Sequence, residues 1–494
     1  TEWVSHFFIF RLPFLGYLME CFMKYLPFLL LTVTFYTQAA PVATPLNPVA
    51  DLTEEQIQQT ERQNQQKQAA QNGEKTSVSM TEEELLQRPD LLKNALDTAN
   101  AQHNIENIRF LLPLYRRLPA EQQDSVLARY SEGLVLMADD KHEAAEKLFN
   151  EILAEHPDYA PVRLQLALSQ SQNGKQREAA NELKTLKQTP DLPAPVAQYI
   201  DQFDAHLQKS KAWQFNANAY YLQDSNVGRT PEQRTYGYWR FAEPKSAHGV
   251  GYELSAQKTT PIKGHWAARV NASAYGKFYW DAHDYDDLVT RLEAGPVWRD
   301  AKQEVSLLPF YEKRWYGGKA YSYTTGGLMR YSRVLSPKWQ VFTAWQSGYK
   351  KHDKRTFLDG ASHLGTVSLL YRTSPYQYFV VSWGGGENSA KDKSEAYRFG
   401  NLGLGWNQQW GSQHSLTTSL HGSVQKRQYR AEDFFNIKRN EKEYFTRLSL
   451  SHKKLAWRGF EPRLNWTWSH VDSNHFYYKY DNHRVFLDVS KQFK

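Results

Sequence analysis

Cysteine is almost absent from this 494-residue sequence, and the single one, Cys21, lies within the first forty residues. We expect that segment to be removed as a targeting sequence, so the mature chain would carry no thiol. This excludes a disulfide framework and a cysteine-based zinc site, and it suits export into an oxidising compartment. It also leaves no cysteine for lipid attachment, so we do not expect the chain itself to be a lipoprotein.

Long apolar runs are missing from most of the chain, whose mean hydropathy is -0.69. Helical membrane proteins do not have this composition, but membrane barrels do, because only alternate strand residues face lipid. Aromatic residues are abundant instead, with 30 Tyr, 25 Phe and 15 Trp, and most of the Trp follow Trp213. The net charge of +7 does not select between contact with lipopolysaccharide, an acidic client and simple solubility.

The first forty residues read as an upstream extension followed by a signal peptide. Residues 1–22 precede a Met-Lys pair at 23–24, an apolar run follows at 25–33, and small residues suited to cleavage stand at Ala39 and Ala40. A membrane anchor is the alternative. Charged side chains interrupt the apolar stretch before it reaches the ~18 residues that a span requires.

The composition and the apolar periodicity of the mature chain divide it into distinct regions. Residues 41–85 are rich in Gln, Glu and Thr, which predicts a polar linker without a core. Residues 86–210 follow a helical pattern that repeats at the spacing of tetratricopeptide repeats. The residues at the most informative repeat positions are Gly133, Ala145, Phe149, Pro157, Ala167, Ala179 and Leu183. A weaker copy upstream consists of Ala99, Leu111, Tyr115 and Leu118.

These repeat residues are expected to pack rather than to react. Small side chains such as Gly133 and Ala145 let the two helices of a hairpin approach closely. Phe149 fills the space between hairpins, and Pro157 ends a helix. We therefore predict an α-solenoid of about three tetratricopeptide-like repeats whose concave face binds a peptide or protein. The alternative is a solenoid that only spaces other parts of the molecule.

After residue 211 the apolar period changes to two, which is typical of strands that are apolar on one face only. Leu416 and Leu420 alternate with Thr417 and Ser419, and similar alternation surrounds Trp266 and Trp466. A soluble sandwich would show the same alternation. Aromatic clusters at the predicted strand ends, as at 275–280 and 476–480, favour a barrel in lipid with headgroup belts.

The C-terminal strand adds a second feature that favours a membrane barrel. Val485, Leu487, Val489 and Phe493 share one face, and the near-terminal aromatic resembles the signal read by barrel-assembly machinery. We predict that residues 211–494 form a transmembrane antiparallel β-barrel of about fourteen strands, each of ~9–11 residues. The expected strands begin near residues 213, 247, 263, 285, 302, 320, 337, 362, 375, 393, 412, 441, 460 and 482. The longer gaps, at 222–246, 350–361 and 426–440, are expected to be extracellular loops.

Motifs that would indicate an enzyme are not present. The sequence has no His-Glu-x-x-His, no Gly-x-Ser-x-Gly and no phosphate-binding loop, so we expect no catalytic residue, metal or cofactor. The densest acidic cluster consists of Asp281, His283, Asp284, Asp286 and Asp287. We interpret it as a solvated hairpin loop. A divalent ion site or an Asp-His pair of the kind found in barrel proteases remains the alternative.

Together these features resemble one known family. The repeat block Ala-Ala-Glu-Lys-Leu-Phe at 144–149 with Pro-Asp-Tyr at 157–159, and the barrel tail at 483–491, resemble the surface lipoprotein assembly modulator family. The resemblance covers roughly residues 86–494 and rests on the two-domain architecture more than on a short motif.

The resemblance implies an outer-membrane translocator with its N-terminal domain in the periplasm. Its clients would be surface lipoproteins, and some relatives export soluble haem- or metal-binding proteins. Outer-membrane lipid and lipopolysaccharide, barrel-assembly machinery and periplasmic chaperones would be further partners, and nucleic acid would not. A wet lumen suits a polar chain, and a seam between the first and last strands would offer acyl chains a lateral exit.

Two other functions fit the same architecture. A passive porin explains the barrel but gives the repeat domain no role. Conductance of small solutes would favour this function. A polysaccharide-export channel with a periplasmic scaffold also pairs such repeats with a barrel, and a neighbouring synthase gene would favour it.

Overall fold

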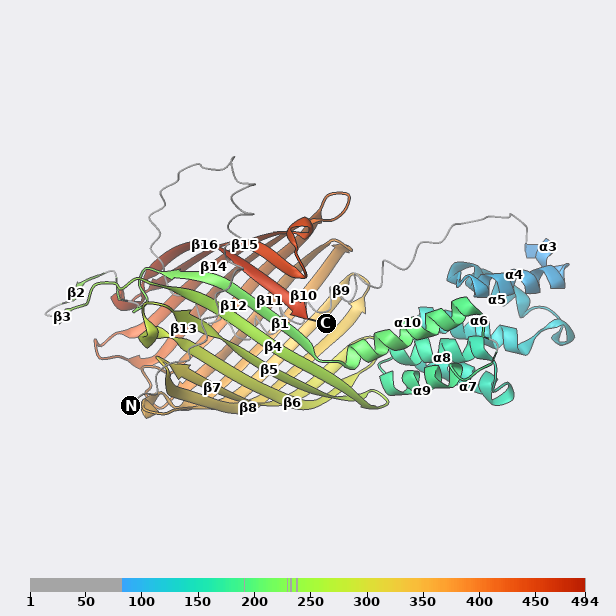
Figure 1. Ribbon diagram of the computed structural model, residues 1–494, viewed down its shortest axis with the longest axis horizontal. Helices are drawn as coiled ribbons and strands as arrows, with labels where there is room; N and C mark the ends of the chain where they lie inside the picture. The colour runs from blue at the N-terminus through green and yellow to red at the C-terminus, as the bar shows by residue number, and fades with distance from the viewer. Residues whose placement is uncertain (1–81, 191, 229, 232, 237–238, 494) are drawn as a thin grey trace, which may run out of the picture. The chain divides into compact units, whose positions relative to one another are not determined.

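The computed structural model describes residues 82–190, 192–228, 230–231, 233–236 and 239–493. The expected extension, signal peptide and most of the polar linker lie outside these ranges. In the described part a helical region precedes a closed barrel of strands (Figure 1).

The helical region is a series of antiparallel pairs joined by short turns. The helices are α3 (Glu82–Leu86), α4 (Pro89–Ala101), α5 (Ile105–Tyr115), α6 (Ser125–Ala138), α7 (His142–Glu155), α8 (Ala160–Gln172), α9 (Gln176–Leu186) and α10 (Ala194–Lys211). Among the described residues, one short 3₁₀ segment, η1 (Ala120–Gln122), lies in the helical region, and four lie between barrel strands: η2 (His283–Tyr285), η3 (Thr356–Leu358), η4 (Lys453–Leu455) and η5 (Phe476–Tyr478). No helix in the described ranges is both long and apolar enough to cross a bilayer.

Local sequence signals explain where several helices begin. The Asn104 side chain accepts a hydrogen bond from the Asn107 N–H at the start of α5, and Asp124 caps α6 through the N–H groups of Val126 and Leu127. Pro89 opens α4 at a position where a missing N–H costs nothing. Residues with oxygen-bearing side chains and prolines therefore fix the starts of these helices.

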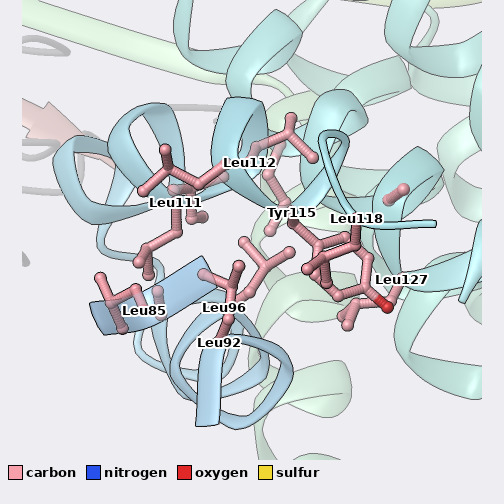
Figure 2. Packing of buried hydrophobic residues seen from close by; sticks show 13 residues of the cluster. Leu85, Leu92, Leu96, Leu111, Leu112, Tyr115, Leu118 and Leu127 are labelled. Carbon is pink, nitrogen blue, oxygen red and sulfur yellow. The ribbon is translucent and has the colours of Figure 1, made fainter. Parts of the chain in front are cut away.

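The first helices share one apolar core, shown in Figure 2. Leu92 and Leu96 of α4 pack with Tyr115 of α5, and all three side chains are fully buried. Leu85 belongs to the same cluster. Within the described residues, α3 therefore belongs to the helical region through this apolar side chain.

Fourteen strands close into one antiparallel barrel, with β1 beside β16 in Figure 1. They are β1 (Gln214–Asp224), β4 (Ala247–Lys263), β5 (Trp266–Tyr279), β6 (Asp287–Arg299), β7 (Gln303–Tyr316), β8 (Lys319–Ser336), β9 (Trp339–His352), β10 (Gly360–Ser374), β11 (Gln377–Ala390), β12 (Tyr397–Trp410), β13 (Leu416–Glu432), β14 (Lys438–His452), β15 (Phe460–Ser473) and β16 (Tyr480–Phe493). Two short strands, β2 (Thr235–Tyr236) and β3 (Trp239–Arg240), form a separate hairpin in the connection from β1 to β4.

The predicted fold class and number of strands are confirmed, and every strand begins within four residues of its expected position. The strands are longer than expected, at 11 to 18 residues. The expected loop at 426–440 is wrong, because β13 and β14 occupy all of it except residues 433–437. The long gap between the expected strand starts near 412 and 441 suggested a loop, but Arg427 and Glu441 form an ion pair inside the barrel.

Strand alternation separates an apolar outer face from a polar lumen. Leu292, Leu307 and Leu404 are more than half exposed on the outer face, as expected of side chains that contact lipid. Residues of opposite parity, such as Glu293 and Ser306, are nearly inaccessible. The barrel therefore presents a lipid-compatible exterior and encloses polar groups together with one apolar cluster, formed by Leu308, Phe310, Leu328, Ala344 and Leu364.

Candidate functional site

The lumen is lined with arginine–carboxylate pairs contributed by many strands. Arg291 on β6 lies 2.7 Å from Glu293 and 3.3 Å from Glu312 on β7, and Arg330 on β8 lies 3.4 Å from Glu293. Further pairs are Arg269–Glu304, Arg314–Asp287, Arg427–Glu441, Arg439–Glu395 and Arg463–Asp488. Both signs of charge are therefore present and matched among these luminal groups.

The acidic cluster between β5 and β6 does not converge on a cation site. Its carboxylates bind separate partners: Asp281 lies 3.0 Å from His248, Asp286 lies 3.1 Å from His283, and Asp287 lies 2.6 Å from Arg314. Among the described residues, no group of three or more His, Cys, Asp or Glu is arranged to hold a metal ion.

The predicted repeat residues lie in the helical core. Ala145, Phe149, Ala167, Ala179 and Leu183 are fully buried. A Cβ at position 133 would lie 2.3 Å from the Phe149 ring, so only glycine fits there without a shift. Pro157 is exposed in the turn after α7, and its carbonyl accepts a hydrogen bond from Arg163.

Phe149 has two packing roles. It contacts Gly133 of α6 within its own hairpin, and its cluster also includes Val162 and Leu166 of the following helix α8. One aromatic side chain thus joins successive repeats, which is how a solenoid builds a continuous core.

The first helices of successive pairs bring polar and aromatic residues together on what we call the tyrosine face, formed by Asp97, His103, Tyr130, Tyr159 and Gln165. Gln165 Nε2 lies 2.7 Å from His103 Nε2, which joins α8 to the end of α4. Burial raises the pKa of Tyr130 to about 12, and the neighbouring Tyr159 and Asp97 act in the same direction. The Tyr130 phenol therefore stays protonated and can donate a hydrogen bond at neutral pH.

The helical repeats contact turns at the end of the barrel where β1 begins. His265 in the turn between β4 and β5 lies 3.0 Å from Glu143 of α7 and 2.9 Å from the carbonyl oxygen of Asn173. The N–H of Gly264 in the same turn donates to Glu178 of α9 at 2.8 Å. Residues from α7, from α9 and from the turn after α8 therefore hold one barrel turn.

The seam between β1 and β16 is the shortest main-chain ladder in the described barrel. It runs from Phe215↔Phe493 to Tyr220↔Asp488, six residue pairs, whereas every other neighbouring pair of strands has ten or more. Beyond Tyr220, β1 continues to pair with β4 as far as Asp224. The two strands therefore separate on the side of the seam that lies away from the helical repeats.

Beyond the end of this ladder, side-chain contacts link β1 and β16. The Tyr220 and Phe486 rings lie 5.4 Å apart across the seam. The Arg484 guanidinium lies 4.9 Å from the Phe486 ring, and its Nη2 donates to the Tyr221 carbonyl oxygen at 3.5 Å. Arg463 on β15 binds Asp488, the last ladder residue of β16, with its closest contact at 2.6 Å.

The predicted C-terminal signal residues fall along β16. Val485 is 66% and Leu487 is 43% exposed on the outer face, and Val489 is half-buried opposite Ala219. Phe493 pairs with Phe215 through its main chain, and its side chain lies outside the described part. These residues share one strand rather than forming a pocket.

Sequence reasoning did not find the residues at the end of the ladder or those on the tyrosine face. Arg484 and Phe486 alternate with Val485 and Leu487, so strand parity alone assigns them to the lumen. Their proximity to Tyr220 had no local signal, because Arg484 lies 263 positions after Tyr221 in the chain.

A closed barrel with an even number of antiparallel strands, an apolar exterior and an ion-paired lumen defines an outer-membrane protein. Comparison with known families narrows this class. Residues 213–493 match the family described as surface lipoprotein assembly modifier, and residues 78–183 match its N-terminal tetratricopeptide repeats. The chain belongs to the surface lipoprotein assembly modifier family.

Individual relatives are similar over most of their length. Surface lipoprotein assembly modifier 1 of Haemophilus influenzae is 30% identical over 85% of this chain and 89% of that protein. The Neisseria meningitidis protein of the same name is 30% identical over 83% of this chain and 84% of its own length. The hemophilin secretion modulator of Acinetobacter baumannii is 24% identical over 85% of this chain and 88% of its own length.

Solved structures add a more distant likeness. A bacterial polysaccharide outer membrane secretin aligns with 58% of this chain and 99% of its own length, at 12% identity and a TM-score of 0.34. The assignment of the barrel rests on its strand pairing.

Proposed function

We propose that this protein moves lipoproteins across the outer membrane to the cell surface. The observation that carries the proposal is a helical repeat domain that contacts the turns of a barrel whose lumen is lined with matched charges. Membership in the surface lipoprotein assembly modifier family supports it, as do the names of the relatives.

In this proposal the repeat domain and the barrel have separate roles. The repeats lie in the periplasm, at the end of the barrel where β1 begins and β16 ends. The tyrosine face receives the client there. The lumen then accepts a polar chain, because its surface exchanges hydrogen bonds with water and peptide groups. The role is placement rather than chemistry, so the protein acts as a translocator and not as an enzyme.

Soluble haem- or metal-binding proteins are a second class of client. The observation that favours them is the similarity to a hemophilin secretion modulator over most of both chains. Such clients need only the lumen, since they carry no lipid anchor. We also infer contacts with lipopolysaccharide on the outer face, and assembly through barrel-assembly machinery with the help of periplasmic chaperones.

Co-expression with a candidate lipoprotein in a host without a homologue tests the proposal. The lipoprotein should become sensitive to protease added to intact cells, while its total amount stays unchanged. A periplasmic marker must remain protected in the same cells, because a leaky membrane would imitate display. If no lipoprotein and no haem-acquisition protein is exposed or released, the translocator proposal is wrong, and conductance of small solutes through the purified barrel becomes the next measurement.

A further inference from the structure

The incomplete seam reaches from the headgroup level into the hydrocarbon layer. Along the outer face of β16, the polar residues Asp481 and His483 come first, and Asp481 lies 3.3 Å from the Trp468 indole nitrogen. Apolar Val485 and Leu487 follow, at 66% and 43% exposure. A polar, Trp-containing band followed by aliphatic residues is the pattern of a barrel strand entering lipid.

An open strand edge at this depth is costly. Residues 481–487 of β16 and 221–224 of β1 have no ladder partner across the seam in the described part of the chain. Hydrocarbon offers no hydrogen bonds to exposed N–H and C=O groups, and lipid-exposed sheet edges do not occur there. Something other than bulk lipid must therefore cover the upper seam at least part of the time.

The side chains beside this unpaired edge favour a particular kind of ligand. On the lipid side, Tyr221, Val485 and Leu487 are large, apolar and exposed. On the lumen side, the Arg484 guanidinium is held by the Tyr220 and Phe486 rings at 5.6 and 4.9 Å. A ligand with apolar chains beside a polar, carbonyl-bearing head meets both surfaces, since arginine is a donor only and carbonyl oxygens accept from it.

An aromatic stack closes the seam above the gap. The hairpin of β2 and β3 belongs to the connection from β1 to β4, and its Tyr236 ring stacks on Phe476 between β15 and β16 at 4.2 Å. Phe241 of the same connection lies 5.7 Å from Tyr477. The gap in the ladder is thus bounded by this stack above and by the six-pair ladder below, and its lipid-facing side chains are Tyr221, Val485 and Leu487.

We propose that this opening, which we call the seam slot, binds the acyl chains of a client lipoprotein and passes them from the lumen to the outer leaflet. The slot is bounded by residues 221–224 and 481–487. Acyl chains lie along Tyr221, Val485 and Leu487, and Arg484 donates to the ester carbonyls of the anchor. This inference rests on the proposed function, since it assumes that clients arrive with a lipid anchor.

A cross-link across the slot tests the assignment. In a Cys21→Ser background, Tyr221→Cys and Leu487→Cys are joined in intact cells by a short bis-maleimide. The matched control joins Ala217→Cys and Lys491→Cys, which pair within the six-pair ladder and share the lipid-facing parity of Tyr221 and Leu487. Heat modifiability on a gel checks that both barrels fold. We expect the slot cross-link to abolish display of a lipidated client and the control to leave it unchanged; unchanged display with the slot cross-linked overturns the proposal.

A second client separates acyl passage from passage of the polypeptide. The same client without its anchor cysteine should still be released by the cross-linked barrel, because it carries no acyl chains that need the slot. If the cross-link stops both forms, the slot admits a client strand rather than acyl chains, and the assignment is wrong. Failure of the uncross-linked protein to display any client counts against the proposed function instead.

A direct measurement covers the case in which the cysteine variants do not fold. A client lipidated with a photoactivatable fatty acid is co-expressed with the unmodified barrel and irradiated. We expect label on peptides that contain residues 481–487 or 221–224. Label confined to other outer-face peptides, such as those around Leu307 of β7, would overturn the assignment without any substitution in the seam.

Discussion

At the scale of single residues, one carboxylate caps the start of α6. The Asp124 carboxylate accepts hydrogen bonds from Val126 and Leu127 at 3.0 and 3.1 Å and lies 3.4 Å from Lys93 Nζ. Partial burial acts to raise the pKa of Asp124, but the Leu127 N–H, Lys93 and the Val126 N–H outweigh it and lower that pKa. The ionised form is therefore stabilised in the folded helices.

A pH-dependent prediction follows from this lowered pKa. The ionised cap contributes fully above the ordinary Asp pKa of about 3.9 and is lost as the pH falls through the lower folded value. We expect Asp124→Ala to reduce the free energy of unfolding of the helical region by about 1 kcal/mol at neutral pH. Asp124→Asn should cost less, and its difference from wild type should vanish in acid.

Urea unfolding of the full chain in detergent, followed by helical circular dichroism, measures both effects. Glu121→Gln is the control, because that carboxylate is exposed three residues before the cap. A pH-independent cost of Asp124→Asn would show that the charge has no part in the cap.

At the scale of elements, close approach within a hairpin depends on one glycine. A methyl group at Gly133 would lie 2.3 Å from Phe149 Cε1, and Phe149 is fully buried and cannot swing away. We expect Gly133→Ala to destabilise the helical region by about 1–3 kcal/mol, the usual cost of overpacking. Thermal unfolding of the helical signal in the full chain measures it.

A double-mutant cycle with Phe149→Leu tests the same contact. The smaller side chain should relieve the clash, so Gly133→Ala should cost less in the Phe149→Leu background than in the wild type. Strictly additive losses of unfolding free energy would mean that the side chains at positions 133 and 149 do not interact.

At the scale of the whole molecule, the barrel and the repeats are expected to separate in function. The ladder closes β1 on β16 without help from the helices, so a chain lacking residues 41–210 should still assemble and be heat-modifiable on a gel. It should not display a lipoprotein, because no periplasmic surface delivers the client. Protease treatment of intact cells measures this, and normal display by the truncated chain would remove the repeats from the delivery step.

The sequence alone determined the class of each region. Period-two alternation and turn spacing located all fourteen strands, because each strand carries its own pattern of lipid-facing and lumen-facing residues. Small residues at repeat spacing located the helical hairpins, because packing between neighbouring helices is local in the chain. The segment at 426–440 misled because it lies in a long gap between expected strand starts. The ion pairs of Arg427 and Arg439 with Glu441 become visible only when the neighbouring strands are placed.

Only the tertiary structure decided how the barrel closes. The register of β1 on β16 depends on the summed tilt and stagger of all the intervening strands, so no short segment encodes it. The resulting register leaves six residue pairs in the ladder and places Arg484 and Phe486 next to Tyr220 and Tyr221. The seam slot arises from that global constraint, whereas the strands on either side of it follow from their own residues.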